Sequence, residues 1–106
     1  MKKEIHERLE RKGWKLGNAE DFLGLAADEV AMVETRLRIA SAVRELRASQ
    51  ALTQTQVAEK VGSSQSRVAR VEAADESVAL DLLVRTFFAL GASRQDLARV
   101  IGADGP

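Results

Sequence analysis

The chain has 106 residues, enough for one domain with a single core. It contains no cysteine, which excludes disulfide bonds and thiolate metal sites. No apolar run approaches the ~20 residues that span a bilayer, and no apolar stretch follows Lys2 and Lys3. We therefore expect no membrane association, no secretory signal and a cytoplasmic location. Alanine, leucine, glutamate and arginine dominate, which favours an all-α fold.

The formal net charge is zero, but the charges are unevenly distributed. Residues 36–70 carry seven basic and two acidic side chains, whereas the segments before and after them are acidic overall. A basic centre between acidic ends is typical of a site for phosphates, although an arginine-rich, solvated helix face gives the same pattern. The candidate phosphate contacts are Arg36, Arg38, Arg44, Arg47 and Lys60.

Residues 1–26 are predicted to form a short helical extension that serves partner binding or dimerisation. Helices are expected over residues 2–12, ended by Gly13, and over residues 19–23, ended by Gly24.

Residues 27–102 are predicted to form the main domain, a five-helix bundle. Its first helix is expected over residues 27–48, where an apolar residue recurs every three or four positions. The apolar stripe comprises Val30, Val33, Leu37, Ala40, Val43 and Leu46 and is widened by Met32, Ile39 and Ala42. Because this stripe is wider than one partner requires, part of it is expected to face another element or another subunit.

The next two helices are joined by a tight turn. Thr53 and Gln56 form the capping-box pattern that opens the second helix. Gly62 ends this helix, and Ser63 or Ser64 caps the third. The contact between the two helices is assigned to Val57, Ala58, Val61, Val68 and Val71. This arrangement predicts a helix-turn-helix motif.

The third helix then presents a polar face. Because a helix has about 3.6 residues per turn, Ser66, Arg70 and Ala73 face away from the inward valines. A helix of this width fits the major groove of DNA, where its N-terminal residues meet base edges first.

Two further helices complete the predicted bundle. One is expected over residues 80–90, and the other is capped by Ser93 with Asp96 and ends at Gly102. The first of these helices is expected to bury Leu80, Leu83, Val84, Phe87 and Phe88. The second carries Leu97, Val100 and Ile101. The last four residues are expected to fray.

Residues 37–90 resemble the Xre/Cro family of phage-repressor-like helix-turn-helix regulators. The matching motifs are Leu-Thr-Gln at 52–54, Val-Ala at 57–58, Val-Gly at 61–62, Ser-Gln-Ser at 64–66 and Val-Glu at 71–72. The family has a glycine turn after the glutamate, whereas this chain has Ala73-Ala74-Asp75. The sequence therefore leaves the C-terminal end of the third helix undetermined by up to one turn.

The resemblance implies a set of DNA contacts. Gln54 would hydrogen-bond a phosphate of the DNA backbone and support the side chain of the first base-reading residue. Gln65, Ser66 and Arg70 would read bases, and Ser64 and Arg67 would make phosphate or flanking contacts. Physical chemistry agrees for two of them, because glutamine can bond adenine, and arginine guanine, at two points.

Residues 13–25 are similar to a segment of HigA-type antitoxins, in which an N-terminal extension precedes the DNA-binding bundle. This second resemblance implies that the protein represses its own operon and binds a RelE-like ribonuclease toxin. Plain regulators share the same layout, so both roles stay open.

No enzyme, cofactor or metal is expected, since the chain lacks a Cys/His pair, a nucleophile elbow and a glycine-rich phosphate loop. The competing readings are a structural helical hairpin and a protein-interaction module whose main role is masking a toxin or other protein.

One motif buries too little surface for tight binding. We therefore expect a homodimer on inverted-repeat, double-stranded DNA with half-sites ~34 Å apart. Its interface would be the wide stripe of the long helix, or Phe87, Phe88 and the last helix.

Overall fold

The computed structural model describes residues 24–102, which form five helices and no strand. The helices are α3 (Ala27–Ser49), α4 (Gln54–Val61), α5 (Gln65–Glu72), α6 (Leu80–Ala89) and α7 (Arg94–Gly102). The predicted all-α bundle of five helices is confirmed, with boundaries within about one residue of those expected. The helices expected over 2–12 and 19–23, and the C-terminal tail, lie outside the described residues.

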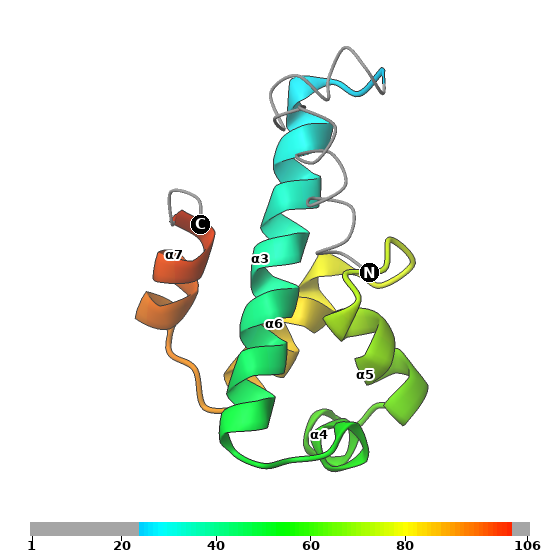
Figure 1. The fold of residues 1–106 in the computed structure, drawn as a ribbon, viewed down its shortest axis with the longest axis vertical. Coiled ribbons are helices and arrows are strands. Elements are labelled where there is room, and N and C mark those ends of the chain that lie inside the picture. The colour runs from blue at the N-terminus through cyan, green and yellow to red at the C-terminus, as the bar shows by residue number, and fades with distance from the viewer. Residues whose placement is uncertain (1–23, 103–106) are drawn as a thin grey trace.

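Helix α3 is the central axis of the bundle (Figure 1). Helices α4 and α5 lie on one side of it and α7 lies on the other, while α6 crosses behind it. Contacts from α3 reach α5, α6 and α7, and the α4–α5 pair packs against itself and against α6. The core is built largely from valines of α3, α4 and α5 together with Leu83, Phe87 and Leu90.

Four helices end in the same hydrogen-bonded turn, which requires one residue with left-handed backbone geometry. Glycine supplies it after α4 and α6, at Gly62 (φ 66°) and Gly91 (φ 100°). Alanine supplies it after α3 and α5, at Ala51 (φ 57°) and Ala74 (φ 55°).

Helix α5 stops at Glu72, so the extra turn left open by the sequence is not formed. The backbone N–H of Asp75 donates to the carbonyl of Arg70, and that of Ala74 donates to the carbonyl of Val71. These two bonds end α5 in a turn at Ala74. The Xre/Cro family, which this segment resembles, has a glycine turn after the glutamate.

The expected inward face of α6 is wrong at one position. Phe88 is 37% exposed, whereas Thr86 is fully buried and its hydroxyl donates to the Leu82 carbonyl at 2.7 Å. Phe87 and Leu83 occupy the core, and Phe88 lies about 100° around the helix from Phe87. On α7, the Ile101 side chain is 42% exposed.

Candidate nucleic-acid interface

Side-chain caps fix the starts of α4 and α5, the two helices of the motif. At the start of α4, the Gln56 N–H donates to Thr53 Oγ1 at 3.0 Å and the Thr53 N–H donates to Gln56 Oε1 at 2.8 Å. At the start of α5, the N-cap is Ser64, whose hydroxyl oxygen accepts from the Arg67 N–H at 3.2 Å. Of the two serines expected to cap this helix, Ser64 is therefore the one used.

Valines hold α5 against the rest of the bundle. Val68 and Val71 are 1% and 0% exposed, and they pack in the same core cluster as Val57 of α4. The predicted contact between the helices of the motif is confirmed. Because the valines occupy the inward face, the opposite face of α5 is left to polar side chains.

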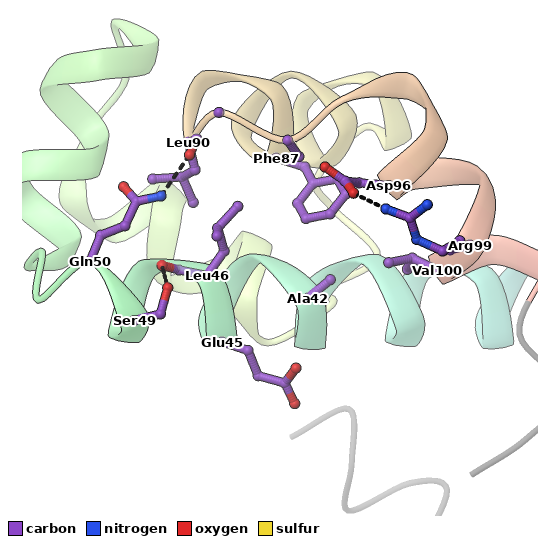
Figure 2. A pocket seen from close by; sticks show the side chains of 12 residues that line it. Ala42, Glu45, Leu46, Ser49, Gln50, Phe87, Leu90, Asp96, Arg99 and Val100 are labelled. Atoms are coloured by element: carbon purple, nitrogen blue, oxygen red, sulfur yellow. Dashed lines mark hydrogen bonds and ion pairs between the residues drawn. The ribbon is translucent and has the colours of Figure 1, made fainter.

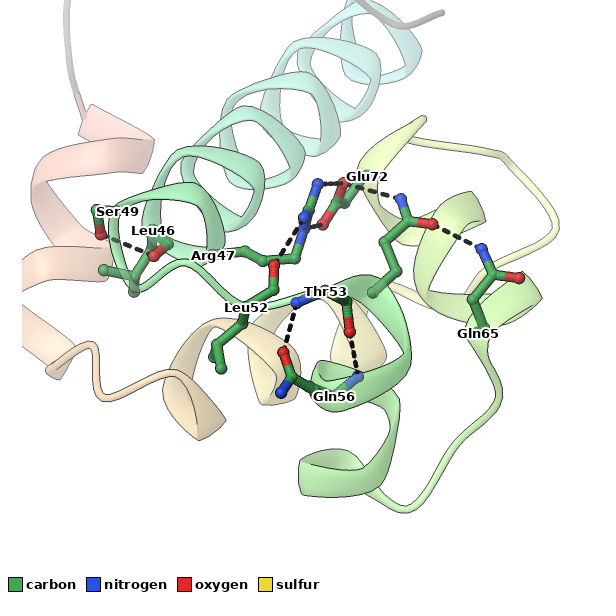
Figure 3. A network of polar contacts seen from close by, with 9 residues as sticks. Leu46, Arg47, Ser49, Leu52, Thr53, Gln56, Gln65 and Glu72 are labelled. Carbon is green, nitrogen blue, oxygen red and sulfur yellow. Dashed lines mark hydrogen bonds and ion pairs between the residues drawn. The ribbon is translucent and has the colours of Figure 1, made fainter.

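A chain of hydrogen bonds runs from α3 to the start of α5 (Figure 3). Arg47 donates to both carboxylate oxygens of Glu72, from Nε at 2.5 Å and from Nη2 at 3.0 Å. Its Nη1 donates to the Leu52 carbonyl at 2.9 Å. Gln54 Nε2 donates to Glu72 Oε1 at 3.1 Å, and Gln65 Nε2 donates to Gln54 Oε1 at 2.7 Å.

The ionised carboxylate sets the direction of this chain. Glu72 is 4% exposed and can only accept, so Gln54 must turn its NH₂ group toward Glu72 and its oxygen toward Gln65. Gln65 then uses one N–H on Gln54 and keeps its amide oxygen and second N–H for another partner. The hydrogen bonds to Glu72 raise the pKa of the Arg47 guanidinium above its ordinary value.

The remaining predicted site residues lie on the open side of the motif. Exposed side chains belong to Ser64, Gln65, Ser66, Arg67 and Arg70, and Gln54 is half-buried beneath them. The Ser64 and Ser66 hydroxyls lie 3.3 Å apart. The structure thus brings Gln54 to Gln65, as the resemblance implies, and leaves the other positions exposed along α5 and at its N-cap.

Two of the candidate phosphate contacts are engaged inside the protein. Arg47 is bonded to Glu72 and Leu52, and Arg36 Nη1 donates to the Val78 carbonyl at 2.5 Å. All three donor nitrogens of Arg47 bond within the protein, so the expectation that it meets phosphate does not fit this geometry. Arg36 uses only Nη1, which holds α3 to the loop before α6. Arg38 pairs with Glu34 one turn away on α3.

Lys60 is exposed in the last turn of α4, and Arg44 is half-buried on α3. These two side chains stay candidate phosphate contacts, as do Arg36 and Arg38.

The described part of the chain holds no group of three or more acidic, histidine or cysteine side chains arranged to bind a metal ion. No helix within residues 24–102 is long and apolar enough to cross a membrane.

Neither the curated proteins nor the solved structures contain a match to this chain. A family model described as a helix-turn-helix domain matches residues 38–100, which is more than half of the sequence and includes the whole of α4, α5 and α6. The matched region holds the turn at Gly62, the valine contact and the polar face of α5. The chain therefore belongs to the helix-turn-helix domain family, a family of DNA-binding regulators.

Proposed function

We propose that the protein is a sequence-specific transcriptional repressor that inserts α5 into the major groove of its operator. The observation that carries this proposal is the hydrogen-bonded chain from Arg47 through Glu72 and Gln54 to Gln65. It holds an exposed amide at the start of a helix with its acceptor and one donor free. A rigidly held reading group loses little conformational freedom on binding, which favours discrimination between sites.

Gln65 and Arg70 are the proposed base readers. An amide oxygen with an adjacent N–H matches the donor and acceptor that adenine presents in the major groove, and a guanidinium matches the two acceptors of guanine. Ser66 lies between them on the exposed side of α5. Ser64, Arg67 and the half-buried Gln54 are proposed to contact the flanking phosphates.

The proposed active species is a homodimer on an inverted repeat. The described domain is about 41 × 27 × 21 Å and carries one eight-residue recognition helix. One such helix reads only a few base pairs, so two copies related by a two-fold axis are needed for a specific site.

Fluorescence anisotropy with duplexes tests the proposal. Wild-type protein, Arg70→Ala and the matched control Arg94→Ala, which removes an exposed arginine from α7, are titrated onto operator and scrambled DNA. The operator is taken from the protein's own promoter or selected from random duplexes.

We expect the preference for operator to fall by ~1–3 kcal/mol in Arg70→Ala and to persist in the control. Affinity should also weaken as salt rises, since phosphate contacts release counterions. Equal loss in both variants, or a preference unchanged by Arg70→Ala, would contradict the assignment.

An antitoxin role is the finer form of this proposal. It is supported by the similarity of residues 13–25 to HigA-type antitoxins and would add a RelE-like ribonuclease as partner in the cytoplasm. Co-expression with such a toxin tests it. Arg70→Ala should still neutralise the toxin while failing to repress, and a protein that never protects cells would restrict the role to plain regulation.

An interaction module that masks a protein without binding DNA is the alternative, and it predicts no operator preference in the anisotropy experiment.

A further inference from the structure

The loop between α5 and α6, residues 73–79, is held tightly against the bundle. Its Val78 side chain is 4% exposed, and the Val78 carbonyl accepts a hydrogen bond from Arg36 Nη1 of α3. The Val78 N–H donates to the Asp75 carbonyl at 3.1 Å. In Figure 1 the loop lies on the same side of α3 as α5, away from the open groove of about 700 Å³ between α3 and α7 (Figure 2). The loop is thus a fixed part of the side that carries the proposed base readers.

Within this loop, the Asp75 carboxylate is held near Arg70. The Asp75 N–H donates to the Arg70 carbonyl at 3.0 Å, which ties the two residues together at the end of α5. The carboxylate oxygen Oδ1 accepts from the Ser77 N–H at 2.8 Å, so the direction of the side chain is set. Hydrogen bonding from Ser77 lowers the pKa of Asp75, and the positive charge of Arg70 lowers it further. An ionised carboxylate therefore lies within electrostatic reach of the proposed guanine reader.

The Arg70 guanidinium takes part in none of the ion pairs within residues 24–102. Those pairs are Arg38 with Glu34, Arg47 with Glu72 and Arg99 with Asp96. Arg70 is exposed, so its N–H donors stay available, and guanine needs only two of the five. Asp75 thus acts on Arg70 through its charge and does not occupy the donors that would read a base.

The two kinds of DNA contact open to Arg70 respond differently to this charge. A guanidinium attracts phosphates at any sequence, and a carboxylate beside it weakens that attraction because the net charge of the two groups is close to zero. The paired hydrogen bonds to guanine depend on the position of the donors and persist beside the carboxylate. The carboxylate therefore weakens contacts with phosphates more than contacts with the matching base.

We propose that Asp75 is a specificity-determining residue that acts through Arg70, lowering the affinity for DNA of the wrong sequence more than the affinity for operator. Specificity is a difference between two affinities, so weakening the wrong complex raises it as effectively as strengthening the right one. The inference rests on the proposed function, since it requires α5 to read bases with Arg70.

Two charge-neutralising variants test the inference. Asp75→Asn removes the charge and keeps an amide oxygen that can accept from the Ser77 N–H, so the turn is retained. Glu76→Gln is the matched control, because it removes one negative charge from the next residue of the loop, which is exposed. Both variants and wild type are titrated by fluorescence anisotropy onto operator and scrambled duplexes at several salt concentrations. Circular dichroism verifies that each variant is folded.

For Asp75→Asn, we expect the affinity for scrambled DNA to rise about fivefold and the affinity for operator to change by less than about twofold. The log–log salt dependence on scrambled DNA should steepen by about one, since Arg70 then engages a phosphate. Glu76→Gln should change both affinities by the same factor and leave the preference for operator as it is in wild type.

A double variant separates action through Arg70 from plain repulsion of DNA. In the Arg70→Ala background, Asp75→Asn should raise the affinity for scrambled DNA no more than Glu76→Gln does. A fivefold rise in that background, or an equal preference in Asp75→Asn and Glu76→Gln, overturns the inference. If wild type prefers operator and loses that preference in Arg70→Ala, such a result removes only the role of Asp75. A wild type without any preference contradicts the proposed function and this inference with it.

Discussion

On one side of α3, helices α4 and α5 are held by valines that are almost completely buried and by a continuous chain of hydrogen bonds. On the other side, α7 contributes no buried residue and leaves an open groove. The two sides share one long helix, so the difference lies in what is packed against it. The side that carries the proposed base readers is held in place before any binding, whereas α7 has no buried residue to hold it as firmly.

The largest effect is expected where the two sides meet, at Arg47. Arg47→Ala leaves the buried Glu72 carboxylate without its cation and frees Gln54, so we expect a loss of about 3 kcal/mol in the free energy of unfolding. Urea denaturation measures it. Arg38→Ala removes an arginine from a pair within the same helix whose carboxylate, that of Glu34, is 39% exposed, and it should cost less than about 0.5 kcal/mol. Equal losses in the free energy of unfolding would show that the hydrogen bonds of Arg47 do not stabilise the side formed by α4 and α5.

A matched pair of valines sharpens the comparison. Val68→Ala deletes two methyl groups from a fully packed site on α5 and should cost about 2 kcal/mol. Val100→Ala deletes the same groups from the half-buried wall of the groove, where the cost should stay below about 1 kcal/mol for the monomer. The same denaturation experiment, at concentrations below dimer formation, gives both values. A Val100→Ala loss as large as that of Val68→Ala would mean that α7 is packed as firmly as α5.

The turn after α5 offers a gain in stability. Ala74 holds a left-handed backbone, which strains any residue with a Cβ, so Ala74→Gly should raise the free energy of unfolding by about 0.5–1 kcal/mol. Gly91→Ala is the reverse change in the equivalent turn after α6. A Cβ at Gly91 would meet no atom within 4 Å, so its expected destabilisation comes from the backbone alone. If Ala74→Gly destabilises, the geometry of this turn is not the one described.

The smallest expected effect is the pH dependence of the stability of α7. Hydrogen bonding from Ser93 lowers the pKa of Asp96, so the ionised form stabilises the start of α7. That contribution is complete above the ordinary aspartate pKa, about 3.9, and is lost as pH falls through the lower folded value. Hydrogen exchange, corrected for intrinsic rates, should show α7 amides losing protection there before those of α5. Asp96→Asn should remove this dependence, and a variant that keeps it would assign the effect to another group.

Local signals predicted most of the fold. The capping pairs Thr53 with Gln56 and Ser93 with Asp96 both form, and Gly62 ends α4 as expected. Each of these signals acts within a few residues, where the chemistry of the side chains is sufficient. By contrast, the run of apolar residues in α6 does not define which side faces inward. Apolar character alone favours Phe88 over Thr86 for the inward side, and the structure has the reverse.

The candidate site was only partly accessible to sequence reasoning. The contact of Gln54 with Gln65 followed from the family resemblance, not from spacing. The pairing of Arg47 with Glu72 joins residues 25 positions apart, and no local pattern marks Glu72 as buried. The positive φ angles at Ala51 and Ala74 were also missed, because glycine is the usual signal for that geometry and neither position carries it.

An NMR titration of the full, isotope-labelled chain with its preferred duplex tests the central claim most directly, because it reports both sides of α3 in one experiment. We predict that amide resonances of residues 53–56 and 64–70 shift on binding, while those of residues 94–101 keep the positions they have in the free protein. Shifts concentrated in α7 and the groove, with α5 unaffected, would contradict the assignment of α5 as the DNA-reading helix.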